Sequence, residues 1–353
     1  MAPAGADGRP DPGNPPDPGT TDPGTIVIGL VNNMPDAALR RTEGQFRALL
    51  GGTPPGPAIL VKSFYLPEVP RSDRAKMYLE AFHQPVGSLW DSPVDGLIVT
   101  GTEPRAPVLA DEPYWRSLTA LVDWACDNTV STIWSCLAAH AAVLHLDGIQ
   151  RQTLGGKLSG VFECRKVSPH PLLAGIPASW HVPHSRYNGL PEARLAARGY
   201  QILSAGEGAG ADIFVRQRAS LFVFLQGHPE YDRFALFREY RRDIVRFLTG
   251  ERDVYPEMPA GYFDDETAIA MAEFRRRALR SRGAGMLDSL PADINGASIR
   301  HAWHDTAVSV FANWVSHLAA RKLFPFASAD AVFFEGLGGM AAAGPRQTSV
   351  VSS

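Results

Sequence analysis

The chain has 353 residues, of which 45% are hydrophobic and 20% charged, a balance typical of one large globular domain or two small ones. Its formal net charge of -3 provides no basic field for nucleic acid or for an acidic membrane surface. No apolar run reaches the roughly 18 residues that a membrane-spanning helix needs. We therefore expect neither nucleic acid nor a membrane as a partner.

The N-terminal segment 1–24, MAPAGADGRPDPGNPPDPGTTDPG, is rich in Pro, Gly and Asp, which predicts a disordered leader. It lacks the basic start and the apolar core of a secretory signal. Cysteine is sparse and odd in number, at Cys126, Cys136 and Cys164, which argues against a disulfide framework and favours a reducing cytoplasm. These cysteines also lack the paired CxxC spacing of a zinc site, so we expect no metal.

Strands and helices alternate along the first half of the chain. Short β-branched or apolar runs predict strands at 25–31, 58–66, 94–101 and 130–135. Apolar residues at helical spacing predict helices at 39–50, 112–128, 137–146, 231–248, 265–281 and 299–323. This alternation indicates an α/β fold with a mostly parallel sheet flanked by helices, and the chain becomes more β-rich after Asp147. Residues 25–325 then form one domain with a C-terminal helical extension, and 326–353 is a flexible tail.

Cys136 lies between the strand 130–135 and the apolar helix that follows, in the stretch IWSCLAAH. A strand, a sharp turn with a nucleophile and a helix form the nucleophile-elbow arrangement. The positive end of the helix favours a thiolate, and its free N–H groups, beginning with Leu137, can hold an oxyanion. The alternative is a buried structural cysteine, which is our interpretation of Cys126 and Cys164.

A candidate base lies in FVFLQGHPEYD, where an apolar strand is predicted to end at Gly227. His228 follows the carboxyl end of that strand, where α/β sheets place their chemistry, and Glu230 lies two residues further on. A thiol nucleophile needs a base, and the imidazole needs a carboxylate to fix its tautomer. The alternative is an ordinary loop histidine. The pattern nevertheless predicts a catalytic set of Cys136, His228 and Glu230.

Several stretches in a fixed order make a specific combination: VDGLIVTG with EPYW, STIWSCLAAHAAVLHLDGI, KLSGVFE, HPLLAGIPASWHVPHSRY, GHPEYD with EYRRD, and AWHDTAVSVFANW. Over most of residues 25 to 320 they resemble the homoserine O-succinyltransferase (homoserine O-acyltransferase) family. The resemblance implies a class I glutamine amidotransferase-like, flavodoxin-like fold. An ordinary glutaminase domain has glycines around its cysteine, as GxCxG, where this chain has Trp134 and Ala138.

The resemblance also implies an activity: transfer of an acyl group from acyl-CoA, a co-substrate, to the hydroxyl of L-homoserine in methionine biosynthesis. No bound cofactor is implied. Cys136 would carry the acyl group in a ping-pong reaction, His228 would take the proton from the substrate hydroxyl, and Glu230 would orient His228.

The family's substrate-binding residues can be placed by motif. They fall on Lys157 of KLSG, Ser185 of PHSRY and Arg242 of EYRRD. Cations and acceptors of this kind suit the carboxylate and the ammonium of an amino acid. A homodimer is the assembly that the resemblance implies.

The chain departs from the family pattern in four places, one of which is Asp305 and Thr306 near the C-terminal end, where the family usually has SH. After VNNMP it has Arg40 and Arg41 where the family has a lysine-bearing loop, and the segment 265–290 looks like an inserted helix. The position that helps set acyl choice, Gly in succinyl-using and Glu in acetyl-using members, falls on Arg105. A guanidinium there can pair with the distal carboxylate of succinyl-CoA, which acetyl-CoA lacks, so succinyl is favoured. The alternative is that Arg105 points to solvent.

Three alternatives to homoserine acylation stay open at the level of sequence. The acceptor could be L-serine, because one methylene group is worth only about 1–3 kcal/mol in a pocket. The protein could be a glutaminase that feeds ammonia to a partner, against which the missing GxCxG pattern speaks. It could also be a ligand-binding relative, which would have no need of a nucleophile and its base.

Overall fold

The computed structural model describes residues 24–291, 294, 296 and 298–324. The predicted leader and tail lie outside these residues, apart from Gly24. No helix in the described part of the chain is long and apolar enough to cross a membrane.

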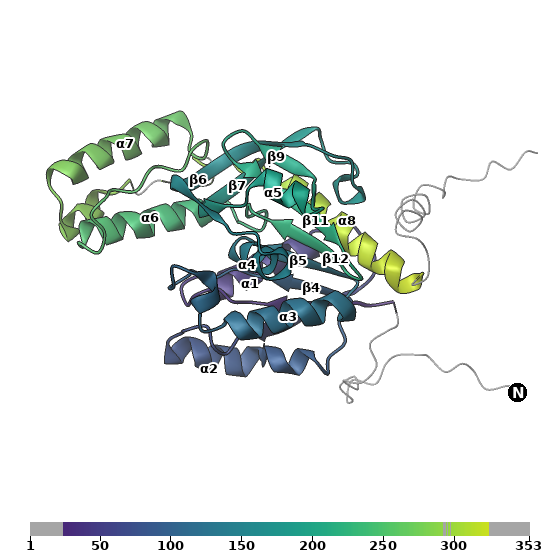
Figure 1. Cartoon of the computed structure of the whole chain (residues 1–353). Helices are drawn as coiled ribbons and strands as arrows, with labels where there is room; N and C mark the ends of the chain where they lie inside the picture. The colour runs from purple at the N-terminus through teal and green to yellow at the C-terminus, as the bar shows by residue number, and fades with distance from the viewer. Residues whose placement is uncertain (1–23, 292–293, 295, 297, 325–353) are drawn as a thin grey trace, which may run out of the picture.

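A large sheet forms the centre of the molecule (Figure 1). In the described residues it has eight strands, in the order β3 (Gln84–Pro85), β2 (Ile59–Tyr65), β1 (Ile26–Val31), β4 (Gly96–Val99), β5 (Ser131–Ser135), β12 (Leu221–Leu225), β11 (Ile213–Gln217) and β8 (Gln201–Ile202). Neighbouring strands from β3 to β12 pair in parallel, and β11 and β8 add on in antiparallel fashion. The predicted α/β class with a mostly parallel sheet is confirmed.

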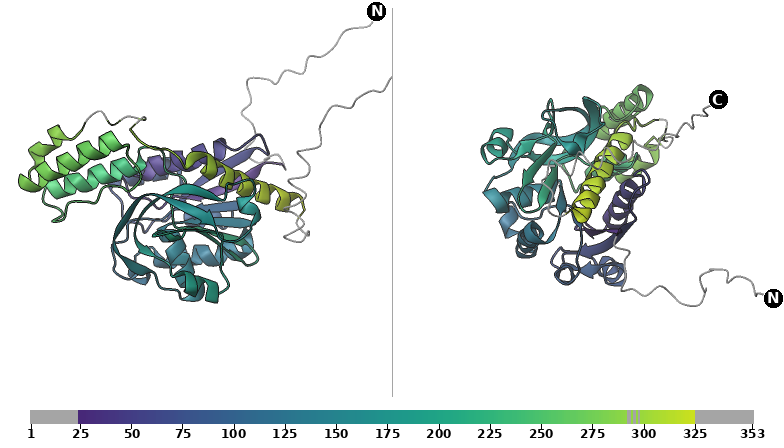
Figure 2. Two further views of the ribbon diagram at one scale, coloured as in Figure 1. Left: turned by 90° about the horizontal axis from the view of Figure 1, so that it is seen from above. Right: turned by 90° about the vertical axis from the view of Figure 1, so that its right-hand side faces the viewer.

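Strand β1 shows how the sequence builds two cores at once. Its side chains alternate, so that Ile26, Ile28 and Leu30 join one apolar cluster, and Val27 and Val31 join the other. Helices α3 (Trp115–Asn128) and α4 (Leu137–Asp147) cover the valine face, and α1 (Leu39–Gly51) and α8 (His304–Leu323) cover the isoleucine face. The views in Figure 2 show these helix layers around the sheet.

Helix α8 packs directly on the sheet and ties back to its first strand. A Cβ atom on Gly96 would lie 2.9 Å from the Trp314 ring, so only glycine lets the helix approach β4 this closely. At the other end of α8, Lys322 Nζ donates to the carbonyl oxygen of Thr25 at 2.7 Å and to Asp95 Oδ2 at 2.8 Å. The predicted C-terminal helix is therefore part of the central core.

A smaller antiparallel sheet and a helical lobe complete the fold. The sheet has the order β10 (Gly210–Ala211), β9 (Ser204–Gly206), β6 (Gln152–Lys166) and β7 (Ser179–Gly189). The lobe contains α6 (Ala235–Leu248), α7 (Asp265–Arg280) and the short helix η4 (Ala284–Ser289), on the left of Figure 1. It has its own apolar cluster, which includes Tyr262, Phe274 and Trp303. That 265–290 is an insertion remains a prediction.

Some predicted boundaries differ from the structure. The helix predicted from 231 begins at Ala235, because the Asp232 side chain accepts the Phe234 N–H and holds the preceding residues in a turn. The last helix begins at His304 instead of 299. Two helices had no prediction: α2 (Asp73–Phe82), which buries only Ala75 and Leu79, and the short α5 (Glu192–Ala197).

Candidate active site

Cys136 occupies a strained turn between β5 and α4. Its φ of 50° and ψ of -110° make it the only non-glycine residue with a positive φ in the described part of the chain. Backbone strain of this kind concentrates at functional sites, and here it lifts the thiol out of the strand at the start of a helix. The turn is held by the Cys136 N–H, which donates to the Leu225 carbonyl at 2.7 Å. The predicted elbow geometry is present.

The amide of Leu137 lies against a glycine loop. A Cβ atom on Gly101 would lie 2.9 Å from the Leu137 nitrogen and 3.3 Å from the Ser135 carbonyl oxygen. Only a residue without a side chain fits there, and it leaves room beside the first N–H of α4. This space next to Cys136 is where an oxyanion would need its donors.

His228 and Glu230 form a buried pair beside Cys136. His228 Nδ1 lies 2.8 Å from Glu230 Oε1, and both side chains are buried. Cys136 lies close enough to the imidazole to help raise the pKa of His228. The strand before this pair, β12, ends at Leu225 and not at Gly227 as predicted, because the Gly227 N–H turns to the Asp212 carboxylate. The three predicted catalytic residues are thus brought together.

The electrostatics of this trio favour a charged imidazole. Burial acts to lower the pKa of His228, but the negative charges of Glu230 and Cys136 outweigh it and hold that pKa well above its usual range. The Tyr231 ring stacks on the imidazole with ring centroids 4.3 Å apart. An imidazolium held in this way can stabilise a thiolate and later release its proton to a leaving group.

The three predicted substrate-binding residues surround two acidic side chains of α6. Lys157 Nζ lies 3.1 Å from Glu239 Oε2 and 3.1 Å from Asp243 Oδ2. The Ser185 hydroxyl donates to Glu239, and Arg242 donates to Asp243 Oδ1 at 3.1 Å. The structure therefore places Lys157, Ser185 and Arg242 in one polar cluster.

This polar cluster adjoins the predicted catalytic pair, His228 and Glu230. The Tyr231 hydroxyl donates to Glu239, while its ring stacks on His228. Burial acts to raise the pKa of Glu239, but the Lys157 charge and the hydroxyls that donate to it lower the value to about 2. Burial also acts to lower the pKa of Lys157, and Glu239 and Asp243 outweigh it and raise that pKa. Both partners are therefore charged at neutral pH.

Glu239 and Asp243 are residues that sequence reasoning missed. A signal for Asp243 existed, because it falls on the buried face of α6 with Tyr240, Ile244 and Phe247. A carboxylate on an apolar helix face is costly to bury unless it meets a cation, which predicts partners such as Lys157. No comparable signal marks Glu239, because it does not fall among the buried residues of α6 and a partly exposed glutamate on a helix is ordinary.

Arg105 lies apart from this cluster, in a cavity of about 270 Å³. Thr102 and Tyr114 line that cavity, and both also line the small pocket above Leu137. The Arg105 backbone N–H donates to Glu112 Oε1, which fixes the loop, and the side chain is exposed. The guanidinium forms no ion pair within the described residues, although Glu103 and Glu112 also line this cavity.

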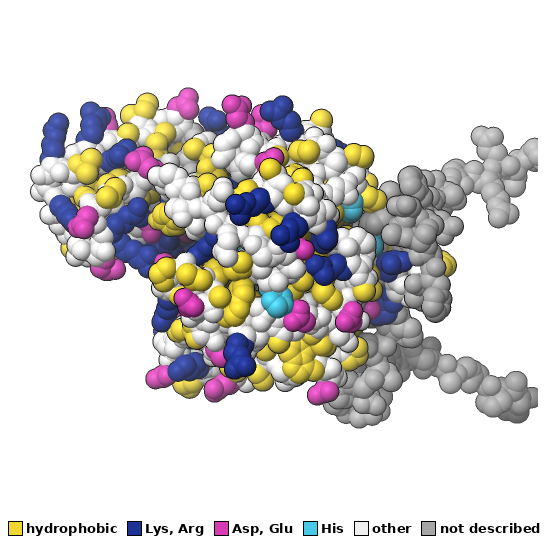
Figure 3. All heavy atoms as spheres, in the orientation of Figure 1, with side chains coloured by type: hydrophobic (Ala, Val, Ile, Leu, Met, Phe, Trp, Pro, Cys, Tyr) yellow, Lys and Arg dark blue, Asp and Glu magenta, His cyan; other side chains and the backbone are white. Residues whose placement is uncertain are grey.

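The polar cluster opens to solvent through a second, larger cavity of about 470 Å³ under α6. Tyr187, Arg242, Arg246 and Arg252 are among its lining residues. Figure 3 shows Lys and Arg side chains gathered along the junction between the helical lobe and the rest of the molecule. Glu103, Asp243 and Glu251 line the same cavity, so a small substrate that carries charges of both signs can reach the cluster from outside.

Comparison with known proteins identifies the family. The family model described as homoserine O-succinyltransferase matches residues 20–323. The chain belongs to the homoserine O-succinyltransferase family. Homoserine O-succinyltransferases of Methylorubrum extorquens and Rhodopseudomonas palustris are 48% and 50% identical over 296 residues, which cover 84% of this chain and 88% and 89% of theirs. That of Bradyrhizobium japonicum is 46% identical over 322 residues, 90% of this chain and 95% of its own.

Solved structures of glutamine amidotransferases also align with this member of the homoserine O-succinyltransferase family. The protein from Methylobacillus flagellatus has a TM-score of 0.47 at 17% identity, and covers 83% of this chain and 95% of its own. That from Thermotoga maritima has a TM-score of 0.46 at 11% identity, with 84% and 98% covered.

Proposed function

We propose that this protein transfers an acyl group, with succinyl preferred, from acyl-CoA to the hydroxyl of L-homoserine through an acyl-cysteine on Cys136. The observation that carries the proposal is the strained elbow at Cys136, which meets the buried His228–Glu230 pair in a chain nearly half identical to homoserine O-succinyltransferases. The product would enter methionine biosynthesis.

The first half-reaction is acylation of the enzyme. The Cys136 thiolate attacks the thioester carbonyl, and the oxyanion that forms lies beside the Leu137 N–H. As the carbon–sulfur bond to coenzyme A breaks, the departing thiolate takes the proton from the His228 imidazolium. Acyl-CoA is a co-substrate in this scheme, and every proton is carried by residues of the chain.

The second half-reaction needs His228 as a base. Acylation removes the thiolate charge, which is one of the two charges that raise the pKa of His228. The imidazole, which has already given its proton to the departing thiolate, therefore stays neutral while Cys136 is acylated, and it can accept the proton of the homoserine hydroxyl. The alkoxide oxygen attacks the acyl carbon, and the Cys136 thiolate leaves. Glu230 keeps the imidazole oriented through its 2.8 Å contact with Nδ1.

The polar cluster supports binding of an amino acid. Lys157 and Arg242 carry positive charge for the substrate carboxylate, and Glu239 and Ser185 offer acceptors for its ammonium group. Without substrate these side chains neutralise one another through Asp243 and Glu239. Arg105, with no ion pair among the described side chains, is the candidate partner for the distal carboxylate of a succinyl group.

The experiment is intact-protein mass spectrometry after mixing the enzyme with succinyl-CoA or acetyl-CoA and no acceptor. We expect wild type to gain about 100 Da with succinyl-CoA, the mass of the acyl group, and Cys136→Ala to gain nothing. Cys126→Ala is the matched control, because Cys126 is another partly exposed free cysteine and should leave the adduct in place. L-homoserine, added afterwards, should remove the adduct, and L-serine should not. No adduct on wild type with either donor would overturn the acyl-cysteine and return glutamine hydrolysis to consideration.

The assembly and the compartment are also proposals. We expect a homodimer, which the family resemblance implies, and light scattering would measure its mass. We expect a cytoplasmic protein, and the three free cysteines are consistent with a reducing compartment.

A further inference from the structure

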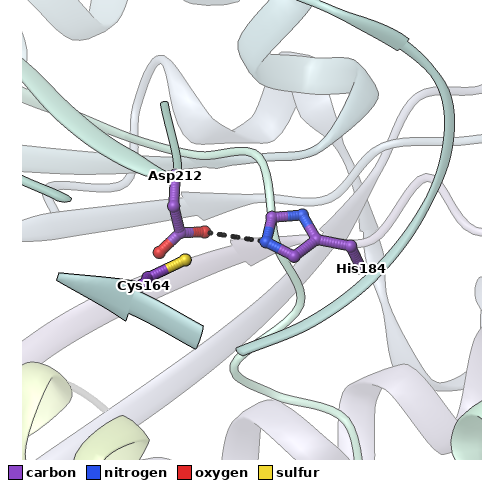
Figure 4. A group of neighbouring side chains, drawn as sticks. All are labelled: Cys164, His184 and Asp212. Carbon is purple, nitrogen blue, oxygen red and sulfur yellow. Dashed lines mark ion pairs between the residues drawn. The ribbon is translucent and has the colours of Figure 1, made fainter. Parts of the chain in front are cut away.

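A second cluster of reactive side chains lies behind the catalytic histidine. It consists of Cys164 on β6, His184 on β7 and Asp212 immediately before β11 (Figure 4). The sulfur, nitrogen and oxygen atoms that these residues present lie within 4.8 Å of one another, and all three side chains are buried. Such a donor set would suit zinc. The hydrogen bonds that these three side chains make show whether a metal site is compatible with the structure.

The hydrogen bonding argues against a metal. Arg186 Nε donates to His184 Nδ1 at 3.4 Å, and a guanidinium can only donate. Nδ1 is therefore the acceptor, and a neutral ring carries its proton on Nε2, which faces Asp212 Oδ1 at 3.6 Å. Burial, with help from the charges of Arg186 and His228, holds the pKa of His184 well below its usual range, so the ring is neutral. A metal bound to Nε2 would displace this proton. The neutral ring would then carry its proton on Nδ1, where it would meet the donating N–H of Arg186.

The carboxylate of Asp212 is already engaged on both oxygens. Oδ2 accepts the Ser204 hydroxyl at 3.1 Å, and Oδ1 accepts the Gly227 N–H at 3.2 Å. A Cβ atom on Gly227 would lie 2.7 Å from Asp212 Oδ1 and 3.1 Å from the His184 ring, so glycine is needed for this approach. The cluster is thus fitted closely to the backbone next to His228.

The backbone N–H groups of the three consecutive residues 226–228 each donate a hydrogen bond. The Gln226 N–H donates to the Asp212 carbonyl at 2.9 Å, the Gly227 N–H to the Asp212 carboxylate, and the His228 N–H to the Pro183 carbonyl at 2.8 Å. Asp212 therefore supplies two of the three acceptors that fix the backbone of the catalytic histidine. His184, the residue after Pro183, contacts the same carboxylate from the other strand.

The cluster also places one negative charge near the imidazole. Burial raises the pKa of Asp212 to about 6, while its hydrogen bonds and the charges of Arg186 and His228 act in the opposite direction. Above that pH the carboxylate is ionised. The Arg186 guanidinium is buried as well, and it donates its other N–H groups to the carbonyl oxygens of Asn188 and Ala209. Its charge is offset by Asp212 across the neutral His184 ring.

We propose that Arg186, His184 and Asp212 form a buried positioning chain that fixes the turn 226–228 and keeps His228 aligned and charged beside Cys136. The proposal rests on the role proposed for His228. The titratable groups that face His228 or Asp212 from the surrounding elements are Cys136, Cys164, His184, Arg186, Glu230, Tyr231 and Glu239.

The test is Asp212→Asn, which keeps an oxygen for the Gly227 N–H and removes the charge. The His228 ring is titrated by NMR on ¹³C-histidine-labelled protein, with the signal assigned from His228→Gln. We expect the pKa of His228 to fall by about one unit, because a nearby negative charge favours the imidazolium. We also expect kcat to fall about tenfold or more with the homoserine KM unchanged, as for a residue that acts through the base. The titration uses no substrate, so its result does not depend on whether the proposed acyl-transfer reaction is correct.

Two sets of variants separate positioning from packing. Cys164→Ala alters the same buried cluster but none of the three residues of the positioning chain. It should therefore change neither the His228 titration nor kcat. His184→Gln offers an acceptor to Arg186 and an N–H to Asp212, so it should retain most of kcat, whereas His184→Leu should lose about tenfold or more. If Asp212→Asn does not fold, this pair decides, and equal kcat values for the two would overturn the proposal. So would an unchanged His228 pKa in folded Asp212→Asn, or one equivalent of zinc in the purified protein.

Discussion

Replacement of Glu230 by Gln tests the catalytic trio most directly. The change keeps the shape of a buried side chain and removes its charge, at a carboxylate 2.8 Å from His228 Nδ1. A hydrogen bond to a charged partner contributes about 1.5–3 kcal/mol. If it is lost mainly in the transition state, turnover falls about 10- to 150-fold, since each 1.36 kcal/mol is tenfold in rate. A glutamine that donates its amide N–H to Nδ1 would also fix the wrong tautomer and deepen the loss.

The assay separates the two half-reactions of Glu230→Gln. Rapid mixing with succinyl-CoA, followed by mass spectrometry, gives the acylation rate, and addition of L-homoserine to the acylated enzyme gives the transfer rate. We expect both rates to fall with little change in the homoserine KM. Glu239→Gln is the matched comparison, because Glu239 contacts Lys157 and Ser185 and should chiefly raise that KM. A KM effect alone in Glu230→Gln, or the same pattern in both variants, would refute the reasoning.

Three further substitutions test other parts of the structure. Arg105→Gly should lower kcat/KM for succinyl-CoA about tenfold or more, the value of a charged hydrogen bond, and leave acetyl-CoA unaffected; equal losses with both donors would discard the idea. Gly101→Ala places a Cβ atom 2.9 Å from the Leu137 nitrogen and should reduce the acylation rate about 10²–10³-fold, as loss of an oxyanion donor does; a normal rate would remove Leu137 from that role. Gly96→Ala brings a Cβ atom to 2.6 Å from Leu318. Urea unfolding should register a loss of about 1–3 kcal/mol in the free energy of unfolding, and an unchanged midpoint would mean that α8 moves aside at no cost.

Much of the α/β core was predictable because its signals are local. The runs that became β1, β2, β4 and β5 are short, apolar and β-branched, and the helix face of Leu39, Phe46, Leu49 and Leu50 is buried as its spacing predicts. Helix α2 had no such signal, since it rests on the core through two residues only. The proximity of the three proposed catalytic residues could be predicted because Cys136 and His228 each follow a parallel strand, and neighbouring strand ends meet at one edge.

The positioning chain behind His228 could not be predicted in the same way. Its members come from two separate strand regions, with His184 and Arg186 on β7 and Asp212 just before β11, and each looks ordinary in its own stretch of sequence. His184 on β7 meets Cys164 through the pairing of β7 with β6, and Asp212 reaches them through β9, which pairs with β6 and whose Ser204 carbonyl accepts the Asp212 N–H. Pairing between distant segments of an antiparallel sheet leaves no trace in local periodicity. The acidic residues of α6 were missed for a related reason, because their partner Lys157 lies on a different element.

The contact between α8 and the first strand constrains how the protein can be made. The face of β1 with Ile26, Ile28 and Leu30 shares one apolar cluster with Phe311 and Trp314 of α8. Strand β1 leaves the ribosome first, and the helix that covers it emerges only after nearly the whole domain has been synthesised. Until then only α1 covers that face of the growing sheet, and contacts so far apart in sequence close slowly. A chain interrupted before His304 would leave the part of this apolar face that α8 covers exposed to water, so the central core is complete only when synthesis has run through α8.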